Sequence, residues 1–117
     1  MNYDLEERTT RFSENVIYLI GKYRKDTLLF PILSQLIRSA TSIGANYCEA
    51  NGASSKKDFT NKIHICKKEA KETQYWLRIL ASMSSEKPSQ YEEIKREARE
   101  LTLIFSKIAA NSKNNIK

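Results

Sequence analysis

The sequence is poor in the residues that make turns, crosslinks and metal sites. Its 117 residues include three Gly and two Pro, which favours helices joined by few loops. Two Cys are too few for a disulfide framework. A single His excludes, within one chain, any metal site that needs two imidazoles.

Long apolar runs are also missing. The longest are Val16 to Ile20 and the Pro-interrupted run from Leu28 to Leu33, both far shorter than the roughly 20 residues of a membrane span. The opening segment MNYDLEERTT contains no apolar signal sequence. We therefore expect a cytoplasmic protein that does not enter a membrane.

What the sequence does contain is a helical pattern of apolar residues. With 40% hydrophobic and 29% charged residues, the composition predicts a packed core rather than disorder. Apolar side chains recur at helical spacing in four segments, at about 5–24, 30–51, 55–83 and 89–110, and no alternating strand pattern is found. Because short loops make successive helices antiparallel neighbours, we predict an all-α protein, a single up-down-up-down antiparallel four-helix bundle, with residues 111–117 as a frayed tail.

The stretch SATSIGANYCEANGASS, residues 39–55, is rich in small and polar residues. A phosphate-binding loop is excluded because Gly44 and Gly52 are eight residues apart and no Gly-Lys-Ser/Thr follows. Small residues on a helix instead let a neighbouring backbone come close, so we predict a narrow helix that ends near Asn51. Ser55 with Asp58 three residues later resembles a capping box at the start of the third helix.

The third helix has an apolar flank outside its core stripe. The members of this flank lie well away from the core direction at 100° per residue: Ile65, Trp76, Ile79 and Met83. Aromatic and large aliphatic residues of this kind are common in subunit interfaces, so we predict that they lie in an oligomer interface. A second interpretation is that Trp76 covers an edge of the bundle.

The other flank of the third helix is basic. Residues 55–83 hold seven Lys or Arg against three Asp or Glu, which is most of the net charge of +6. The candidate nucleic-acid-binding residues are those that project on this side, namely Lys56, Lys67, Lys68, Lys71 and Arg78. Tyr75 is close to them and could stack on a base. The alternative is an ordinary solvated surface.

No group of residues predicts catalysis, a cofactor or a metal. His64 and Cys66 point about 200° apart on a helix, and Cys48 is expected on another helix. The Glu-x-x-His pairs of di-iron bundles are missing. Arg38 and Glu49, about three turns apart on one helix face, could pair with each other across an oligomer interface.

The central part of the chain resembles a known family. QLIRSATSIGANYCEAN, followed by SKKDFTNKIHICKKEAKETQYWLRIL, is similar to the four-helix-bundle proteins encoded in intervening sequences of 23S ribosomal RNA genes. The resemblance implies an up-and-down bundle and a homopentamer. It extends to the accessory protein of diversity-generating retroelements, a basic pentameric bundle that works with a reverse transcriptase and nucleic acid.

Two functions are compatible with these observations. The first is a non-enzymatic homo-oligomer, expected to be a pentamer, that associates with RNA or DNA through its basic flank. The second is a protein-binding scaffold or adaptor for a polymerase or a ribosome-related partner. No motif that reads bases is visible in the sequence.

Overall fold

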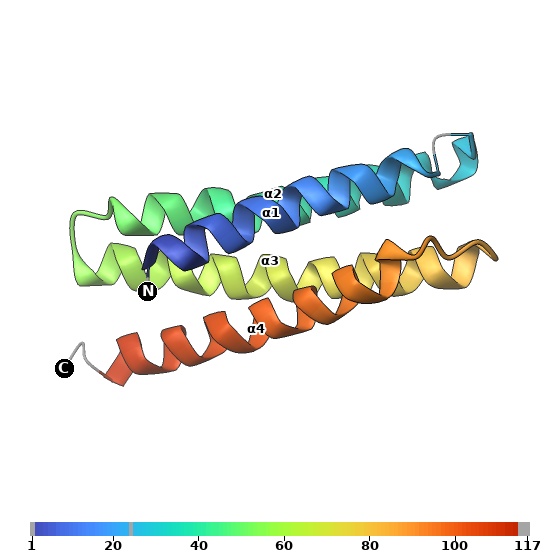
Figure 1. The fold of residues 1–117 in the computed structure, drawn as a ribbon. Helices are drawn as coiled ribbons and strands as arrows, with labels where there is room; N and C mark the ends of the chain where they lie inside the picture. Colours follow the sequence, from blue (N-terminus) through green and yellow to red (C-terminus); the bar gives the residue numbers. More distant parts are fainter. Residues whose placement is uncertain (1, 24, 115–117) are drawn as a thin grey trace.

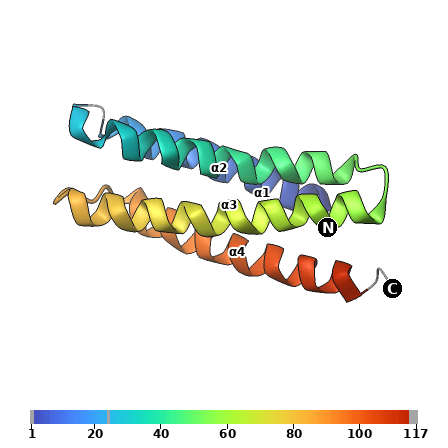
Figure 2. The same ribbon diagram turned by 180° about the vertical axis from the view of Figure 1, so that it is seen from behind.

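Four long helices make up the protein. The computed structural model describes residues 2–23 and 25–114, and within this part no strand occurs. The elements, in chain order, are α1 (Asn2–Gly21), the short 3-10 helix η1 (Thr27–Leu29), α2 (Phe30–Asn51), α3 (Lys56–Met83) and α4 (Gln90–Asn114). Successive helices run in opposite directions (Figure 1), and α3 lies between α2 and α4 in both views (Figure 2). The predicted antiparallel four-helix bundle is confirmed, as a rod of about 50 × 21 × 21 Å.

One hydrophobic core runs the length of the rod. Every long helix contributes a stripe of buried side chains at three- and four-residue spacing, as expected for amphipathic helices that bury one face. Fully buried examples are Val16 in α1, Leu36 in α2, Leu77 in α3 and Leu101 in α4. Each of these helices therefore leaves two flanks and an outer face for other contacts.

The helix bounds agree with the sequence pattern in the middle of the chain and differ at the ends. Helix α1 ends at Gly21, three residues before the expected bound. There the N–H groups of Lys22 and Tyr23 each bond, at 3.0 Å, to the carbonyl three residues back, which tightens the last turn. Tyr23 nevertheless stays in the core.

Helix α4 is longer than expected. It continues to Asn114, so the predicted frayed tail was wrong for residues 111–114, and residues 115–117 lie outside the described part. Ala109 is still buried in the core and no Gly or Pro follows to stop the helix. At the start of α3, the Ser55 side chain accepts a hydrogen bond from the Asp58 N–H at 3.0 Å, which makes Ser55 the N-cap.

Residues 39–51 of the stretch of small residues form the C-terminal half of α2 and pack closely against α1, and residues 52–55 form the turn to α3. A Cβ atom added at Gly44 would lie 3.1 Å from Thr9 Oγ1 and 3.2 Å from Thr9 Cβ. Thr9 is fully buried, and its hydroxyl bonds to the carbonyls of Leu5 and Glu6 at 3.0 Å each. The stretch is therefore a helix that admits a neighbouring helix at Gly44.

Helix α2 and the turn before it are apolar over a longer stretch than the uninterrupted apolar runs of the sequence indicate. Residues 27–51 are long and apolar enough to cross a membrane, judged by length and composition alone. A core helix of a soluble bundle passes the same test. Helix α2 contributes Leu33, Leu36, Ala40, Ile43 and Tyr47 to the core, but 33% of the apolar segment is buried, so packing inside the bundle accounts for part of its apolar character.

Candidate nucleic-acid interface

The two flanks of α3 face different neighbours. On one side Gln74 Nε2 donates a hydrogen bond to Thr102 Oγ1 of α4 at 2.7 Å. On the other side Arg38 of α2 pairs with Glu72. At 100° per residue Lys67 and Lys71 project near Gln74, so the basic flank is on the α4 side. The apolar residues project near Glu72, so the apolar flank is on the α2 side.

The basic flank borders two open hollows in the surface. The first lies along α3 and is lined by His64, Lys67, Lys68, Lys71, Glu72 and Tyr75. The second, which we call the α3–α4 groove, is lined by Lys71, Gln74, Tyr75, Arg78, Ala81, Tyr91, Lys95 and Thr102. Lys71 and Tyr75 line both, so the two hollows form one continuous surface.

Positive charge is uncompensated in the α3–α4 groove. Three cations line it, from Lys71 and Arg78 on α3 and Lys95 on α4, and no acidic residue does. Among the described residues none of these three cations forms an ion pair or a hydrogen bond. A surface with free ammonium and guanidinium groups attracts polyanions, above all phosphate backbones.

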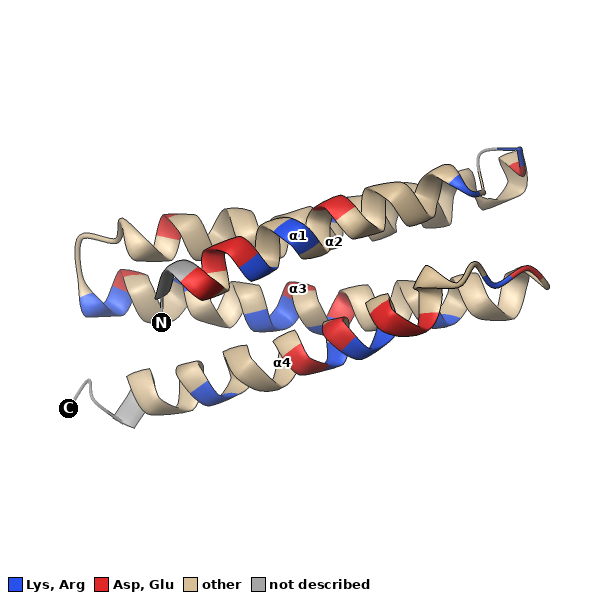
Figure 3. Ribbon diagram, viewed as in Figure 1, with Lys and Arg blue, Asp and Glu red and all other residues tan. Residues whose placement is uncertain are grey.

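Two acids of α4, Glu97 and Glu100, pair with α1. The Arg8 guanidinium bonds to both carboxylate oxygens of Glu97, at 2.6 and 2.8 Å, and to Glu100 at 3.2 Å. These bonds to carboxylates raise the pKa of Arg8 above its usual value. Both signs of charge alternate along the first half of α4 in Figure 3; Glu97 and Glu100 pair with α1, while Lys95 lines the groove beside α3.

Two acids of α3, Glu69 and Glu72, pair on the opposite side with α2. Arg38 pairs with Glu72 and, at 3.5 Å, with Glu69. The hydrogen bond from the Trp76 indole N–H, at 2.9 Å, and the Arg38 charge lower the pKa of Glu72. Glu49 pairs with Lys62 of α3 at 2.5 Å. Within the chain Arg38 and Glu49 both bind to α3, and their pairing with each other across an oligomer interface stays a prediction.

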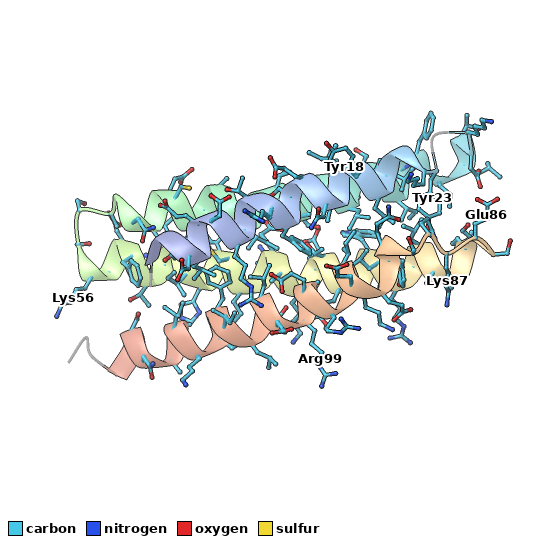
Figure 4. The ribbon with its side chains drawn as sticks, in the orientation of Figure 1. Tyr18, Tyr23, Lys56, Glu86, Lys87 and Arg99 are labelled. Carbon is cyan, nitrogen blue, oxygen red and sulfur yellow. The ribbon has the colours of Figure 1, made fainter. Side chains whose placement is uncertain are left out.

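The structure gathers most of the predicted basic residues, with one exception and one addition. Lys67, Lys68, Lys71 and Arg78 lie along the two hollows. Lys56 does not, because it is the first residue of α3, about 16 Å along the helix axis from Lys67, at the end of the bundle labelled in Figure 4.

Lys95 is a functional candidate that the pattern on α3 did not reveal. It lies on the side of α4 that also presents Thr102, seven residues later, to α3. The sequence does show that Lys95 and Thr102 are seven residues apart and therefore share one side of this heptad-like helix. It does not show that this side of α4 faces the basic flank of α3, and without that knowledge Lys95 cannot be assigned to the site.

The apolar flank is partly covered within the chain. Trp76 packs against the core at the bundle edge, and its ring meets the Tyr75 ring edge-on with centroids 5.1 Å apart. Ile65 and Ile79 are half-buried, and Met83 is 63% exposed. These residues stay available to a partner on the α2 side of α3, away from the α3–α4 groove.

The residues that could act as nucleophiles or metal ligands are separated from one another. His64 is exposed on α3, Cys48 is exposed on α2, and no group of three or more His, Cys, Asp or Glu in the described residues could hold a metal ion. Cys66 is buried, with its thiol 3.4 Å from the Ile43 carbonyl, and burial raises its pKa to about 12. A thiolate nucleophile is therefore disfavoured at this position.

Comparison with known proteins agrees with the sequence resemblance. Residues 2–107 match the model of the 23S rRNA-intervening sequence protein family. The chain belongs to this family. A crystal structure of a protein of unknown function from the S23 ribosomal protein family of Bacteroides thetaiotaomicron is 33% identical in sequence, and the match covers 93% of this chain and 97% of that one with a TM-score of 0.84. No curated protein matches the chain. Neither the family's description nor that of the crystal structure names an enzymatic activity.

Proposed function

We propose that this protein is a non-enzymatic nucleic-acid-binding bundle that holds RNA or DNA in the α3–α4 groove. The observation that carries the proposal is the set of three unpaired cations, Lys71, Arg78 and Lys95, around an exposed Tyr75 with no acid in the lining. Lys67 and Lys68 extend the positive surface along α3. Contacts of this kind neutralise phosphates and release their counterions, so they bind without reading sequence.

We propose further that copies of the chain assemble into a homo-oligomer, a pentamer by the family resemblance, through the apolar flank. The support is the partial exposure of Ile65, Trp76, Ile79 and Met83 on the side of α3 that faces away from the groove. Assembly on that side leaves the groove open and repeats it once per subunit. Repetition multiplies the effective concentration of binding sites for a long polyanion.

Binding of a fluorescent oligonucleotide as a function of salt tests the nucleic-acid proposal. Replacing Lys71, Arg78 and Lys95 by Gln should weaken binding to a single strand. The slope of log affinity against log salt should also fall, by about 0.7 for each phosphate that the variant no longer neutralises. A matched variant removes three charges that line neither hollow, by Lys22→Gln and Lys25→Gln beside the turn after α1 and Lys107→Gln in the C-terminal part of α4.

The two triple variants have the same net charge, so their comparison separates a local site from overall charge. Equal affinity of the groove variant and the control variant would reject the groove as the binding site. Absence of binding by the wild-type protein at low salt would reject the nucleic-acid proposal, and a protein partner of the adaptor type would then be the function to test.

Light scattering tests the assembly. The wild-type mass should be that of five chains of 13.5 kDa each, and Trp76→Ala or Ile79→Lys should lower it, since truncating a buried interface anchor costs about 2 kcal/mol or more. The matched exposed variant is Tyr18→Ala, whose side chain is 72% exposed on α1. A mass of one chain at micromolar concentration would contradict the proposal.

A further inference from the structure

The aromatic ring in the α3–α4 groove indicates which form of nucleic acid the groove suits. Tyr75 is 53% exposed, although it lies between cations and at the junction of the two hollows. It is four residues after Lys71 and three before Arg78, so the three side chains share one face of α3. The ring is thus flanked on both sides by a group that binds phosphate.

The Tyr75 ring is held in place by its contact with the Trp76 ring. Its edge contact with Trp76 has centroids 5.1 Å apart and planes at 68°. Trp76 is itself anchored, because its indole N–H donates to Glu72 and its ring packs against the core. An aromatic platform that is oriented before binding loses little conformational entropy when a base stacks on it.

The remaining polar groups of the groove are already satisfied or neutral. The Gln74 side chain is bound to Thr102, and the Tyr91 hydroxyl donates to the Leu77 carbonyl at 2.7 Å. The lining therefore offers cations and one ring, but no free array of donors and acceptors that would read base edges. Such a combination is typical of proteins that bind single strands with little sequence preference.

Distances along α3 suit a short stretch of strand. Lys71 and Arg78 are seven residues apart, which is a rise of about 10.5 Å along α3 with Tyr75 between them, and an unstacked strand can place a phosphate at each cation. A base between two bound phosphates would then come to Tyr75. In a duplex the faces of internal bases are covered by their neighbours, so the ring has nothing to stack on.

We infer that the α3–α4 groove takes single-stranded nucleic acid in preference to duplex, with a base stacked on Tyr75 and phosphates on Lys71, Arg78 and Lys95. This inference rests on the proposed function and deepens it. The cations supply affinity for any phosphate backbone, and Tyr75 supplies the preference for an unpaired strand.

Fluorescence anisotropy with three probes tests this inference. The probes are oligouridylate and oligothymidylate of about 15 nucleotides, and a duplex of the same length. The wild-type protein should bind both single strands more tightly than the duplex. Tyr75→Leu keeps an apolar contact with Trp76 but removes the ring, and it should weaken single-strand binding about fivefold to a hundredfold while duplex binding and the salt slope stay unchanged.

Two further variants control the experiment. Tyr75→Phe keeps the ring and should bind single strands within about twofold of wild type, since stacking needs only the ring. Tyr18→Leu removes an exposed tyrosine on α1, which Figure 4 shows on the side of the bundle away from α4, and it should leave binding unchanged. Far-UV circular dichroism of each variant checks that the bundle is intact.

The outcomes separate the inference from the proposed function. If Tyr75→Leu binds single strands as tightly as wild type, or if duplex binds as tightly as single strands, the inference is wrong even when the triple cation variant loses binding. If wild-type protein binds none of the probes at low salt, the proposed function fails and the inference fails with it.

Discussion

Replacement of Gly44 by Leu tests the close contact between α1 and α2. The added Cβ would already lie 3.1 Å from Thr9 Oγ1 and 3.2 Å from Thr9 Cβ, closer than ordinary van der Waals contact. Thr9 is fully buried, and its hydroxyl is held by the carbonyls of Leu5 and Glu6. The leucine side chain therefore forces the two helices apart.

The magnitude follows from two opposing effects. Overpacking costs about 1–3 kcal/mol, and exchange of Gly for Leu inside a helix returns about 0.8 kcal/mol. We expect a net loss of about 0.2–2.2 kcal/mol in the free energy of unfolding. For 117 residues the unfolding entropy makes each kcal/mol worth about 4 °C, so the melting temperature should fall by about 1–9 °C.

Thermal unfolding followed by far-UV circular dichroism, at one protein concentration, measures this effect. Gly21→Leu is the matched control, because a Cβ at Gly21 meets no atom within 4 Å, and it should leave the melting temperature unchanged or slightly higher. Gly44→Ala should lie between wild type and Gly44→Leu. An unchanged or raised melting temperature for Gly44→Leu would refute the close packing of α1 on α2.

Three further predictions concern single side chains. Burial raises the pKa of Cys66 to about 12, so Cys66 should resist alkylation in the native protein and react only after denaturation, whereas exposed Cys48 should react first. Mass spectrometry of the labelled peptides measures this, and modification of Cys66 in the native protein would contradict it. The pKa of Glu72 is lowered in the folded protein, so the stabilising contribution of Glu72 is present above the ordinary carboxyl pKa of about 4.5 and is lost as pH falls through the lower native value. Trp76 donates a hydrogen bond to Glu72, so the fluorescence of Trp76 should change below about pH 4.5. The Glu72→Gln variant should not show this transition. Arg8→Gln should lower the free energy of unfolding by about 1 kcal/mol or less, because it removes the ion pair with α4. High salt should reduce this difference between variant and wild type, and an undiminished difference would show that the ion pair is not its cause.

Much of the fold could be predicted because it depends on residues close together in the chain. The spacing of apolar residues located four helices, and the bounds of α2 match those expected, from Phe30 to Asn51. The Ser55 cap was visible because a cap joins residues three apart. The ends of α1 and α4 were less accurate, since they depend on a tightened turn after Leu19 and on packing around Ala109.

The candidate site was predictable only in part. Periodicity determines the angle at which Lys67, Lys71 and Arg78 leave the α3 axis, and so their common flank was evident from the sequence. It does not determine which helix is the neighbour at that angle. Tertiary structure decided that α4 lies there and brings Lys95 to the groove.

The geometry of each helix already turns two acids away from the groove. On α3 the 100° step puts Glu72 beside the apolar flank, and on α4 it puts Glu97 about 200° from Lys95. Arg38 of α2 and Arg8 of α1 pair with these acids across helix boundaries. The sequence by itself determined four amphipathic helices and a basic flank, because both follow from the geometry of a single helix. Only the packing of the four helices decided which charges remain unpaired, because pairing depends on which flanks meet.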